Sequence, residues 1–337
     1  MNVWKWVAVV LSTMTVLAGC GAGASGDRSD GQGGDAGGVF PVTVEHFFGS
    51  TEVPRAPRRV VALGYTDDQA LLALGVRPVG MVDQYANPPG RDPDINTQWP
   101  WVKAAWGDVR PEVVMANGDS QPNYEKIAVL RPDLIVAVYS DIDRAAYERL
   151  SKIAPTVGRT KAEAEPFSAR WQDNALQISR AVGKAEDGGK LVAGIEQKFA
   201  AVRAAHPEFA GQTAVAVSWY SDSIAPFTST DVRGRILANM GFRASPEIDG
   251  IAGGKFYVRL SPERVDMINL DRIFVIGDEA DHQALRNNPL FASLPAVRAG
   301  KASYVLDSEG PAVGAAMSQS TLLSLPYALD QIAKAVR

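Results

Sequence analysis

The sequence predicts an α/β protein of two lobes, each built on a central sheet, with a long helix between them. Its 337 residues suit two domains of ordinary size. In both halves, short β-branched runs alternate with helical patterns, and this rhythm is typical of parallel strands connected by helices. A short phrase also occurs twice, once in each half. Together these observations favour two similar bodies over one large domain.

The repeated phrase combines a glutamate with an aspartate at a fixed distance. Glu125 precedes Asp133 by as many residues as Glu263 precedes Asp271. Each glutamate lies in the first turn of a short predicted helix that opens with a capping residue, and each aspartate opens a run predicted to be a buried strand. A single such glutamate would most simply complement the helix dipole. Two copies in register indicate an equivalent carboxylate on each lobe.

The N-terminus has the pattern of an export signal. Residues 1–19 contain a sparse positive region and an apolar run, which is too short to span a membrane. Cys20, the only cysteine, follows small residues, as in a bacterial lipobox, so we expect it to be lipidated. The alternative is an ordinary signal peptide. Residues 20–41 are rich in Gly, Ala, Ser and Asp, which predicts a disordered tether.

Residues 42–166 are predicted to form the N-terminal lobe. A hairpin over Val42–Val53 with a Gly49-Ser50 turn comes first, and buried strands follow. A long aromatic segment, residues 83–106, interrupts the alternation of strands and helices. Such a loop either packs on a core or lines a site. We expect at least one of Trp99 and Trp101 to line a binding site.

Residues 167–206 are predicted to form the connecting helices. Their apolar stripes follow helical spacing, and breaks at Gly183 and at Gly188-Gly189 predict two helices, of which the second is a stiff connector without a flexible hinge. Residues 207–337 are predicted to form the C-terminal lobe, with a Gly-rich loop over residues 249–259.

The chain lacks the usual signs of an enzyme. His46, His206 and His282 lie in unrelated segments without metal-ligand spacing, so no metal site is expected. The turn after the first strand has neither a phosphate-binding glycine pattern nor a P-loop lysine, and no nucleophile elbow is present. Asp67-Asp68 suits a helix cap better than paired catalytic carboxylates. The net charge of -4 and the lack of a basic patch argue against nucleic acid.

Aromatic and basic side chains gather instead near the predicted carboxyl ends of strands, where open α/β sheets bind ligands. Aromatic faces with guanidinium groups suit a bulky ligand that carries negative charge. Including the two tryptophans of the long loop, the candidate ligand-binding residues are Tyr65, Trp99, Trp101, Tyr139, Trp219, Tyr220, Arg233, Tyr257 and Arg259.

Several segments of the chain resemble those of a known family. The lipobox cysteine, Arg59–Leu63, Asn123–Ile127 with Leu130–Ile135, and Leu294–Gly300 are similar to segments of iron-siderophore substrate-binding lipoproteins of ABC importers. This is the helical-backbone class that includes ferrichrome and vitamin B12 binders. The residues around Tyr65 and the Trp99–Trp101 segment look like actinobacterial members.

The resemblance implies two Rossmann-like lobes joined by one rigid helix, with a ligand cleft between them. It further implies that one glutamate on each lobe, Glu125 and Glu263 here, docks onto a permease dimer. Arg233 matches a position where hydroxamate-siderophore binders carry a ligand-contacting arginine. The expected location is outside the cell, with the lipid on Cys20 anchored to the outer face of the cytoplasmic membrane.

We therefore expect a monomeric lipoprotein that captures a ferric siderophore and delivers it to an ABC permease. The siderophore would keep the iron wrapped, so the protein needs neither cofactor nor metal ligands. The alternative cargo is haem or a corrinoid, for which Tyr65, Tyr139 or Tyr257 would supply an axial phenolate. An exported hydrolase on the same fold is the remaining class.

Overall fold

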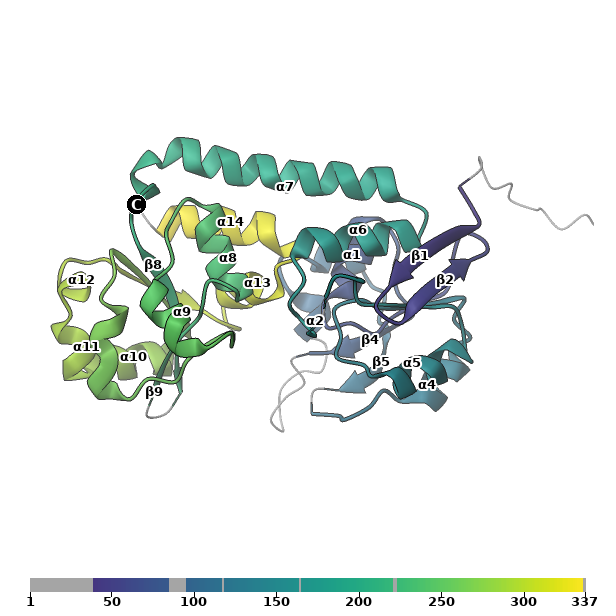
Figure 1. Ribbon diagram of the computed structural model, residues 1–337, viewed down its shortest axis with the longest axis horizontal. Coiled ribbons are helices and arrows are strands. Elements are labelled where there is room, and N and C mark those ends of the chain that lie inside the picture. Colours follow the sequence, from purple (N-terminus) through teal and green to yellow (C-terminus); the bar gives the residue numbers. More distant parts are fainter. Residues whose placement is uncertain (1–38, 85–94, 117, 164, 221–222, 336–337) are drawn as a thin grey trace, which may run out of the picture. The chain divides into compact units, whose positions relative to one another are not determined.

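The computed structural model describes residues 39–84, 95–116, 118–163, 165–220 and 223–335. Cys20, the signal peptide, most of the tether and part of the aromatic segment lie outside these residues. The fold class is confirmed, because the described chain contains two mainly parallel sheets with helices around them and one long helix, α7 (Ala185–Ala205) (Figure 1). The sequence boundaries of the lobes stay a prediction.

The first sheet has five parallel strands in the order β5-β4-β3-β6-β7. Its strands are β3 (Val60–Ala62), β4 (Gly80–Asp83), β5 (Glu112–Ala116), β6 (Leu134–Ala137) and β7 (Thr156–Gly158). The accompanying helices are α1 (Asp67–Ala73), α2 (Ile95–Gln98), α3 (Lys103–Trp106), α4 (Tyr124–Val129) and α5 (Arg144–Ser151). Strand β5, which begins directly after a proline, was not predicted from the sequence.

The second sheet has four strands in the order β11-β10-β8-β9, of which only β9 is antiparallel to its neighbour. Its strands are β8 (Ala214–Tyr220), β9 (Ser223–Pro226), β10 (Arg272–Gly277) and β11 (Ala302–Leu306). The helical segments around it are η1 (Pro207–Phe209), α8 (Val232–Asn239), α9 (Pro246–Ala252), η2 (Pro262–Ile268), α10 (Glu279–Asn287), α11 (Pro289–Ser293) and α12 (Pro295–Arg298). Helix α9 occupies the start of the predicted Gly-rich loop.

The hairpin exists, but its turn differs from the prediction. Strands β1 (Val42–His46) and β2 (Gly49–Val53) pair antiparallel around Phe47-Phe48, and Gly49 already belongs to β2. The two phenylalanines are held by aromatic packing, since the Arg159 guanidinium lies 3.5 Å from the centre of the Phe47 ring and Phe48 stacks on Tyr147 at 4.8 Å. Packing of the turn thus outweighed the local preference of Gly-Ser for turns.

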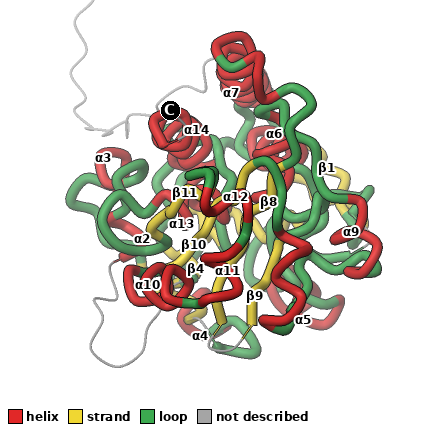
Figure 2. The backbone as a smooth tube through the Cα atoms, turned by 90° about the vertical axis from the view of Figure 1, so that its left-hand side faces the viewer, coloured by secondary structure: helices red, strands yellow, loops and turns green. Residues whose placement is uncertain are grey.

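The connecting helices are α6 (Trp171–Ala181) and α7, and the break between them lies at Gly183. Gly188 and Gly189 lie inside α7 and do not interrupt it, contrary to the prediction. A Cβ at Gly188 would overlap the Ser179 side chain of α6, so this glycine permits close packing of the two helices. Helix α7 also packs on α14 (Ser324–Ala335), and the two lie side by side in both views (Figure 1, Figure 2).

The C-terminal helices return to the first sheet. Helix α13 (Val313–Gln319) ends beside α1, where Gln69 donates a hydrogen bond to Gln319 and accepts one from the Thr321 hydroxyl at 2.6 Å. One hydrophobic cluster accordingly includes residues of both sheets, such as Val136 and Ala216. The last part of the chain therefore joins the two halves, although it follows the second sheet in sequence.

The two copies of the repeated phrase share one structural role, which the aspartates fill. Asp133 accepts hydrogen bonds from the backbone N–H groups of Arg58 and Arg59, just before β3. Asp271 accepts one from the N–H of Thr213, just before β8. Each aspartate thereby fixes the start of its own strand against the neighbouring strand of its sheet.

The helices that precede these aspartates differ. In the first copy, the Asn123 side chain accepts a hydrogen bond from the N–H of Lys126 at 2.9 Å and caps the α-helix α4. The second copy forms the 3-10 segment η2, and the Ser261 side chain makes no capping bond.

We expect Asp133→Ala and Asp271→Ala each to lower the free energy of unfolding by about 1–2 kcal/mol, because each removes a charged acceptor from strand-anchoring N–H groups. The two losses should add, since the sites lie on separate sheets. Urea denaturation measures both. Glu125→Ala, which changes an exposed carboxylate of the same phrase, is the control, and single variants as stable as the parent would contradict the assigned role.

Candidate ligand-binding cavity

A cavity of about 450 Å³ lies between side chains of the two halves. The first half contributes residues that follow β3, β4 and β6, and the second contributes residues of β8 and of the segments around α8 and α9. The lining consists of Tyr65, Gln84, Tyr139, Phe167, Tyr220, Phe227, Asp231, Val232, Arg233, Phe256, Tyr257 and Ser318. Ligand sites of this size and aromatic character are common in proteins.

Five of the nine predicted ligand-binding residues come together in this cavity: Tyr65, Tyr139, Tyr220, Arg233 and Tyr257. The first two follow the carboxyl ends of β3 and β6, as expected for an open parallel sheet. Their contact with a ligand stays a prediction.

A buried carboxylate fixes the two tyrosines of the first half. Asp67 accepts hydrogen bonds from the backbone N–H groups of Gly64, Val138 and Tyr139, at 3.2, 2.7 and 3.0 Å. Gly64 is required here, because a Cβ at this position would overlap the Asp67 carboxylate. The turn after β3 and the end of β6 are thus tied to the same side chain, which places Tyr65 and Tyr139 next to each other.

Phe167 stands between these tyrosines and was missed by the sequence analysis. Its ring centre lies 5.4 Å from that of Tyr65 and 5.1 Å from that of Tyr139. Its φ of +66° is unusual for a bulky residue, and such strain concentrates at ligand sites. The only sequence signal was an aromatic residue after a proline at the start of the connecting segment.

Hydrogen bonds from both sides hold the strained turn. The N–H of Ala169 donates to the buried Glu163 at 3.3 Å. From α8, the Arg235 guanidinium donates to the carbonyls of Ser168 and Ala169 at 3.0 Å each. The turn that carries Phe167 is therefore fixed to the second half of the molecule.

Arg233 and Asp231 form an ion pair in the opposite wall. The Arg233 Nε and Nη2 donate to the two Asp231 oxygens at 2.8 and 3.0 Å, and the guanidinium lies 3.7 Å from the centre of the Phe227 ring. Asp231 also accepts from the N–H of Arg233 and so caps α8. The arginine is held in place, and a carboxylate neutralises its charge.

The remaining side chains of this wall form an aromatic edge. Tyr220 and Tyr257 are each 41% exposed, with ring centres 6.5 Å apart. Arg259 lies outside the lining, with its guanidinium 5.0 Å from the centre of the Tyr220 ring. Trp219, whose side chain packs against the core of the second sheet, is also absent from the lining.

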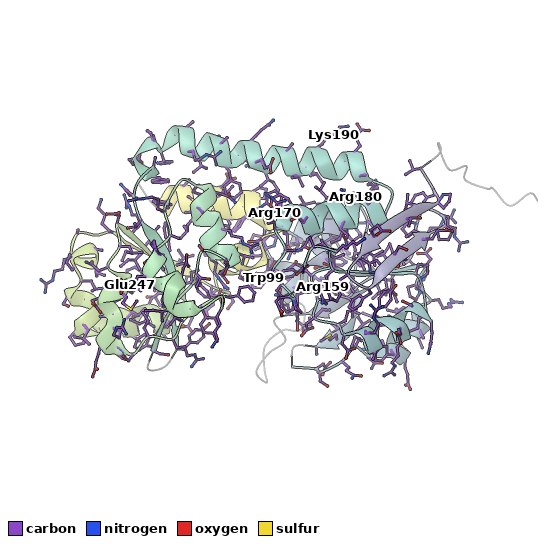
Figure 3. All side chains as sticks on the ribbon, in the orientation of Figure 1. Trp99, Arg159, Arg170, Arg180, Lys190 and Glu247 are labelled. Carbon is purple, nitrogen blue, oxygen red and sulfur yellow. The ribbon has the colours of Figure 1, made fainter. Side chains whose placement is uncertain are left out.

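The two tryptophans of the long aromatic segment are core residues. Trp99 (labelled in Figure 3) and Trp101 are only 3% and 9% exposed, and their rings stack 5.2 Å apart. The Trp101 indole N–H donates to Gln69 at 3.0 Å, and its ring contacts Tyr327 of α14. Neither lines the cavity, so we withdraw both from the candidate ligand surface. Packing against the returning C-terminal helix explains their burial.

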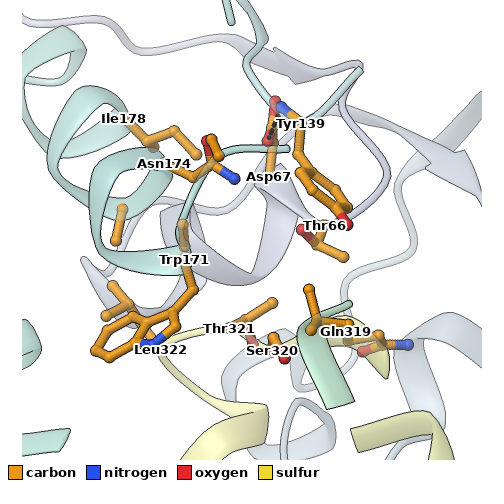
Figure 4. A pocket seen from close by; sticks show the side chains of 14 residues that line it. Thr66, Asp67, Tyr139, Trp171, Asn174, Ile178, Gln319, Ser320, Thr321 and Leu322 are labelled. Atoms are coloured by element: carbon orange, nitrogen blue, oxygen red, sulfur yellow. Dashed lines mark hydrogen bonds between the residues drawn. The ribbon is translucent and has the colours of Figure 1, made fainter. Parts of the chain in front are cut away.

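A second, much smaller cavity of about 20 Å³ adjoins the first through Tyr139 and Val232 (Figure 4). Trp171 and Asn174 of α6 line one side, and the segment from Gln319 to Leu322 lines another. Its volume suits a single water molecule, not an organic ligand. The larger cavity is therefore the candidate site.

The tyrosines of the first half are protonated in the ligand-free protein. Burial raises the pKa of Tyr139 to about 12, and burial also raises the pKa of Tyr65 above its usual value. Within the described chain, no cluster of three His, Cys, Asp or Glu side chains could hold a metal ion, and no helix is long and apolar enough to cross a membrane.

Comparison with known proteins identifies the family. The sequence profile described as "Periplasmic binding protein" matches residues 60–309, which is most of the chain. The chain belongs to this family. Its members are solute-binding proteins and not enzymes, so the chain is a binding protein for a transported solute.

Relatives and solved structures agree with this assignment. The chain is 26% identical over 328 residues to the "Probable siderophore-binding lipoprotein YfiY" of Bacillus subtilis, with 94% of each protein covered. A periplasmic solute-binding protein of Mycobacterium smegmatis is 30% identical, with a TM-score of 0.72 over 88% of this chain and 97% of that one. PiaA of Streptococcus pneumoniae, solved in complex with ferrichrome, is 25% identical, with a TM-score of 0.70 and the same coverage.

The buried Asp67-Asp68 pair predicts a pH-dependent stability. Burial raises the pKa of Asp67 to about 6, and burial together with Asp67 raises the pKa of Asp68 to about 7. Carboxyls with raised folded-state pKa values favour the folded state in acid, and this contribution is lost as the pH rises from about 4 through these values.

We therefore expect Asp68→Asn to raise the melting temperature at pH 8 by at least about 2 °C, because the amide removes the cost of ionising this buried carboxyl. At pH 5 the variant and the parent should melt together. Differential scanning calorimetry at the two pH values measures the difference. An equal shift at both values would show that the carboxyl does not titrate in this range.

Proposed function

We propose that the chain is an extracytoplasmic receptor that binds a ferric siderophore in the 450 Å³ cavity and delivers it to an ABC importer for iron uptake. One observation carries the proposal: within a family of solute-binding proteins, the cavity combines many aromatic faces with a single ion pair, and the described lining offers no metal cluster. The siderophore supplies the iron ligands, so iron enters as cargo and no cofactor is needed.

The names of the relatives point to the same cargo. The Bacillus protein is described as siderophore-binding, and the pneumococcal structure contains ferrichrome. We assign ligand contact to Tyr65, Tyr139, Tyr220, Arg233 and Tyr257, and add Phe167, Phe227 and Phe256 from the cavity lining. Arg259 contacts the Tyr220 ring from outside the lining. Haem or a corrinoid is the weaker candidate, because the relatives named above are described with siderophores.

Ferric siderophores should bind the purified protein with micromolar or lower dissociation constants, measured by quenching of intrinsic fluorescence or by calorimetry. Phe167→Ala should weaken binding at least about fivefold, since an aromatic contact contributes about 1 kcal/mol beyond its buried area. Phe47→Ala, which removes a partly exposed ring from the hairpin turn, is the matched control. The proposal fails if hydroxamate, catecholate and mixed siderophores all leave the signal unchanged.

We assign docking on the permease dimer to Glu125 and Glu263. Both side chains are exposed, and both belong to the repeated phrase, one on each half. In the part of the chain that the structure describes, neither lines the cavity nor takes part in an ion pair. Exposed carboxylates without fold contacts suit a partner that presents arginines.

The double variant Glu125→Ala, Glu263→Ala should abolish uptake of siderophore-bound iron by cells and leave the dissociation constant of the siderophore unchanged. Removing carboxylates that touch only the permease cannot affect the cavity. Uptake of radiolabelled iron and calorimetry give the two readouts. The control is Glu148→Ala, Glu247→Ala, which removes an exposed carboxylate from each half. If affinity for the siderophore were lost together with uptake, the glutamates would belong to the ligand site and not to a docking surface.

We also propose that the protein is anchored to the outer face of the cytoplasmic membrane by lipid on Cys20 and that it acts as a monomer. The anchor is supported by the lipobox pattern and by the lipoprotein name of the Bacillus relative.

Mass spectrometry of the mature protein should find Cys20 at the N-terminus with a lipid attached. Cys20→Ala should abolish the lipid modification, because the thiol that would carry the lipid is gone. An unmodified mature N-terminus at another residue would exclude the lipid anchor while leaving ligand binding intact.

A further inference from the structure

The charge of the cavity restricts the class of siderophore. Among the described lining residues, the charged side chains are Arg233 and Asp231. They form a two-point ion pair in which the side chains are only 20% and 7% exposed. The pair contributes no net charge, so the described wall of the cavity is aromatic, polar and electrically neutral.

The groups around this pair do not change the balance. Tyr139 keeps its proton, because burial raises its pKa to about 12. Arg259 is exposed and lies outside the lining, with its guanidinium 5.0 Å from the centre of the Tyr220 ring, so water screens its charge. The described lining therefore offers no surplus of positive charge.

Ferric siderophores differ in charge by chemical class. Three hydroxamates bring three negative charges, which cancel the charge of the ferric ion and give a neutral complex. Three catecholates bring six negative charges, so their ferric complex has a net charge of minus three, and citrate complexes are also anionic. Removing such an anion from water costs several kcal/mol unless cations replace the lost solvation. A neutral wall cannot provide this compensation.

We propose that the cargo is a neutral ferric trihydroxamate and that Asp231 acts as the selectivity residue. This inference rests on the proposed function and narrows it. Asp231 neutralises Arg233 and thereby prevents the arginine from attracting anionic complexes, while the aromatic rings contact the apolar surface of a neutral one. A carboxylate beside the only described cation of the lining would be unfavourable in a receptor for tricatecholates.

The experiment compares four probes on the mature chain by calorimetry: ferrichrome and ferrioxamine E as neutral trihydroxamates, and ferric enterobactin and ferric dicitrate as anions. We expect the trihydroxamates to bind at least about 100-fold more tightly, which corresponds to about 3 kcal/mol. Tighter or equal binding of either anion would overturn the inference and leave the proposed function intact. Failure of all four and of a mixed-type ferric siderophore to bind would overturn the proposed function itself.

Asp231→Asn tests the reason for the preference. The amide oxygen still caps α8, since asparagine is as good an N-cap as aspartate, but the negative charge beside Arg233 is gone. We expect the ratio of the ferric enterobactin to the ferrichrome dissociation constant to fall at least tenfold. Asp249→Asn is the matched control, because its carboxylate accepts from the Ser229 N–H outside the cavity. An unchanged ratio in Asp231→Asn would overturn the role of Asp231.

Discussion

The three hydrogen bonds to Asp67 are the constraint on which the cavity depends. Strands β3 and β6 are neighbours in the sheet, and a backbone hydrogen bond from the Tyr65 N–H to the Tyr139 carbonyl continues beyond their carboxyl ends. The carboxylate joins these ends through backbone N–H groups, and Gly64 leaves the room that the carboxylate needs. Backbone groups, unlike side chains, cannot change rotamer, so the positions of the Tyr65 and Tyr139 backbones are fixed. The directions in which their side chains face the second half are therefore restricted. Phe167 then packs on both.

The second half is held against this frame by contacts that are distant in sequence. Gln69, next to the aspartate pair, binds Gln319, Thr321 and Trp101, and thus connects α1 with the C-terminal segment and with the aromatic loop. Arg235 binds the turn of Phe167 from the other side. Together with the packing of α7 on α6 and α14, these contacts favour a cavity that is largely formed before the ligand arrives.

Local patterns predicted the fold well but only part of the site. Alternating strands and helices, the break at Gly183 and the cap at Asn123 are properties of short segments, and the structure contains them. Tyr65 and Tyr139 could be placed because parallel strands end at one edge of a sheet. Trp99 and Trp101 could not, because their burial depends on α14, which lies more than 200 residues later in the chain. Phe167 was missed because an aromatic residue after a proline is too weak a local signal to predict a strained turn.

The repeated phrase combines two features: the fold explains the aspartates, and the glutamates carry the docking proposal. Asp133 and Asp271 make equivalent hydrogen bonds at the starts of their strands, so the fold alone explains why an aspartate recurs at this position. Both glutamates lie in the first turn of a helical segment, where the helix dipole favours a carboxylate, but one segment is a capped α-helix and the other an uncapped 3-10 segment, and both side chains are exposed. Neither takes part in an ion pair within the described chain, which supports the proposed docking on a partner that contacts both halves at once. The fixed spacing of the repeat, in contrast, is explained by the aspartates.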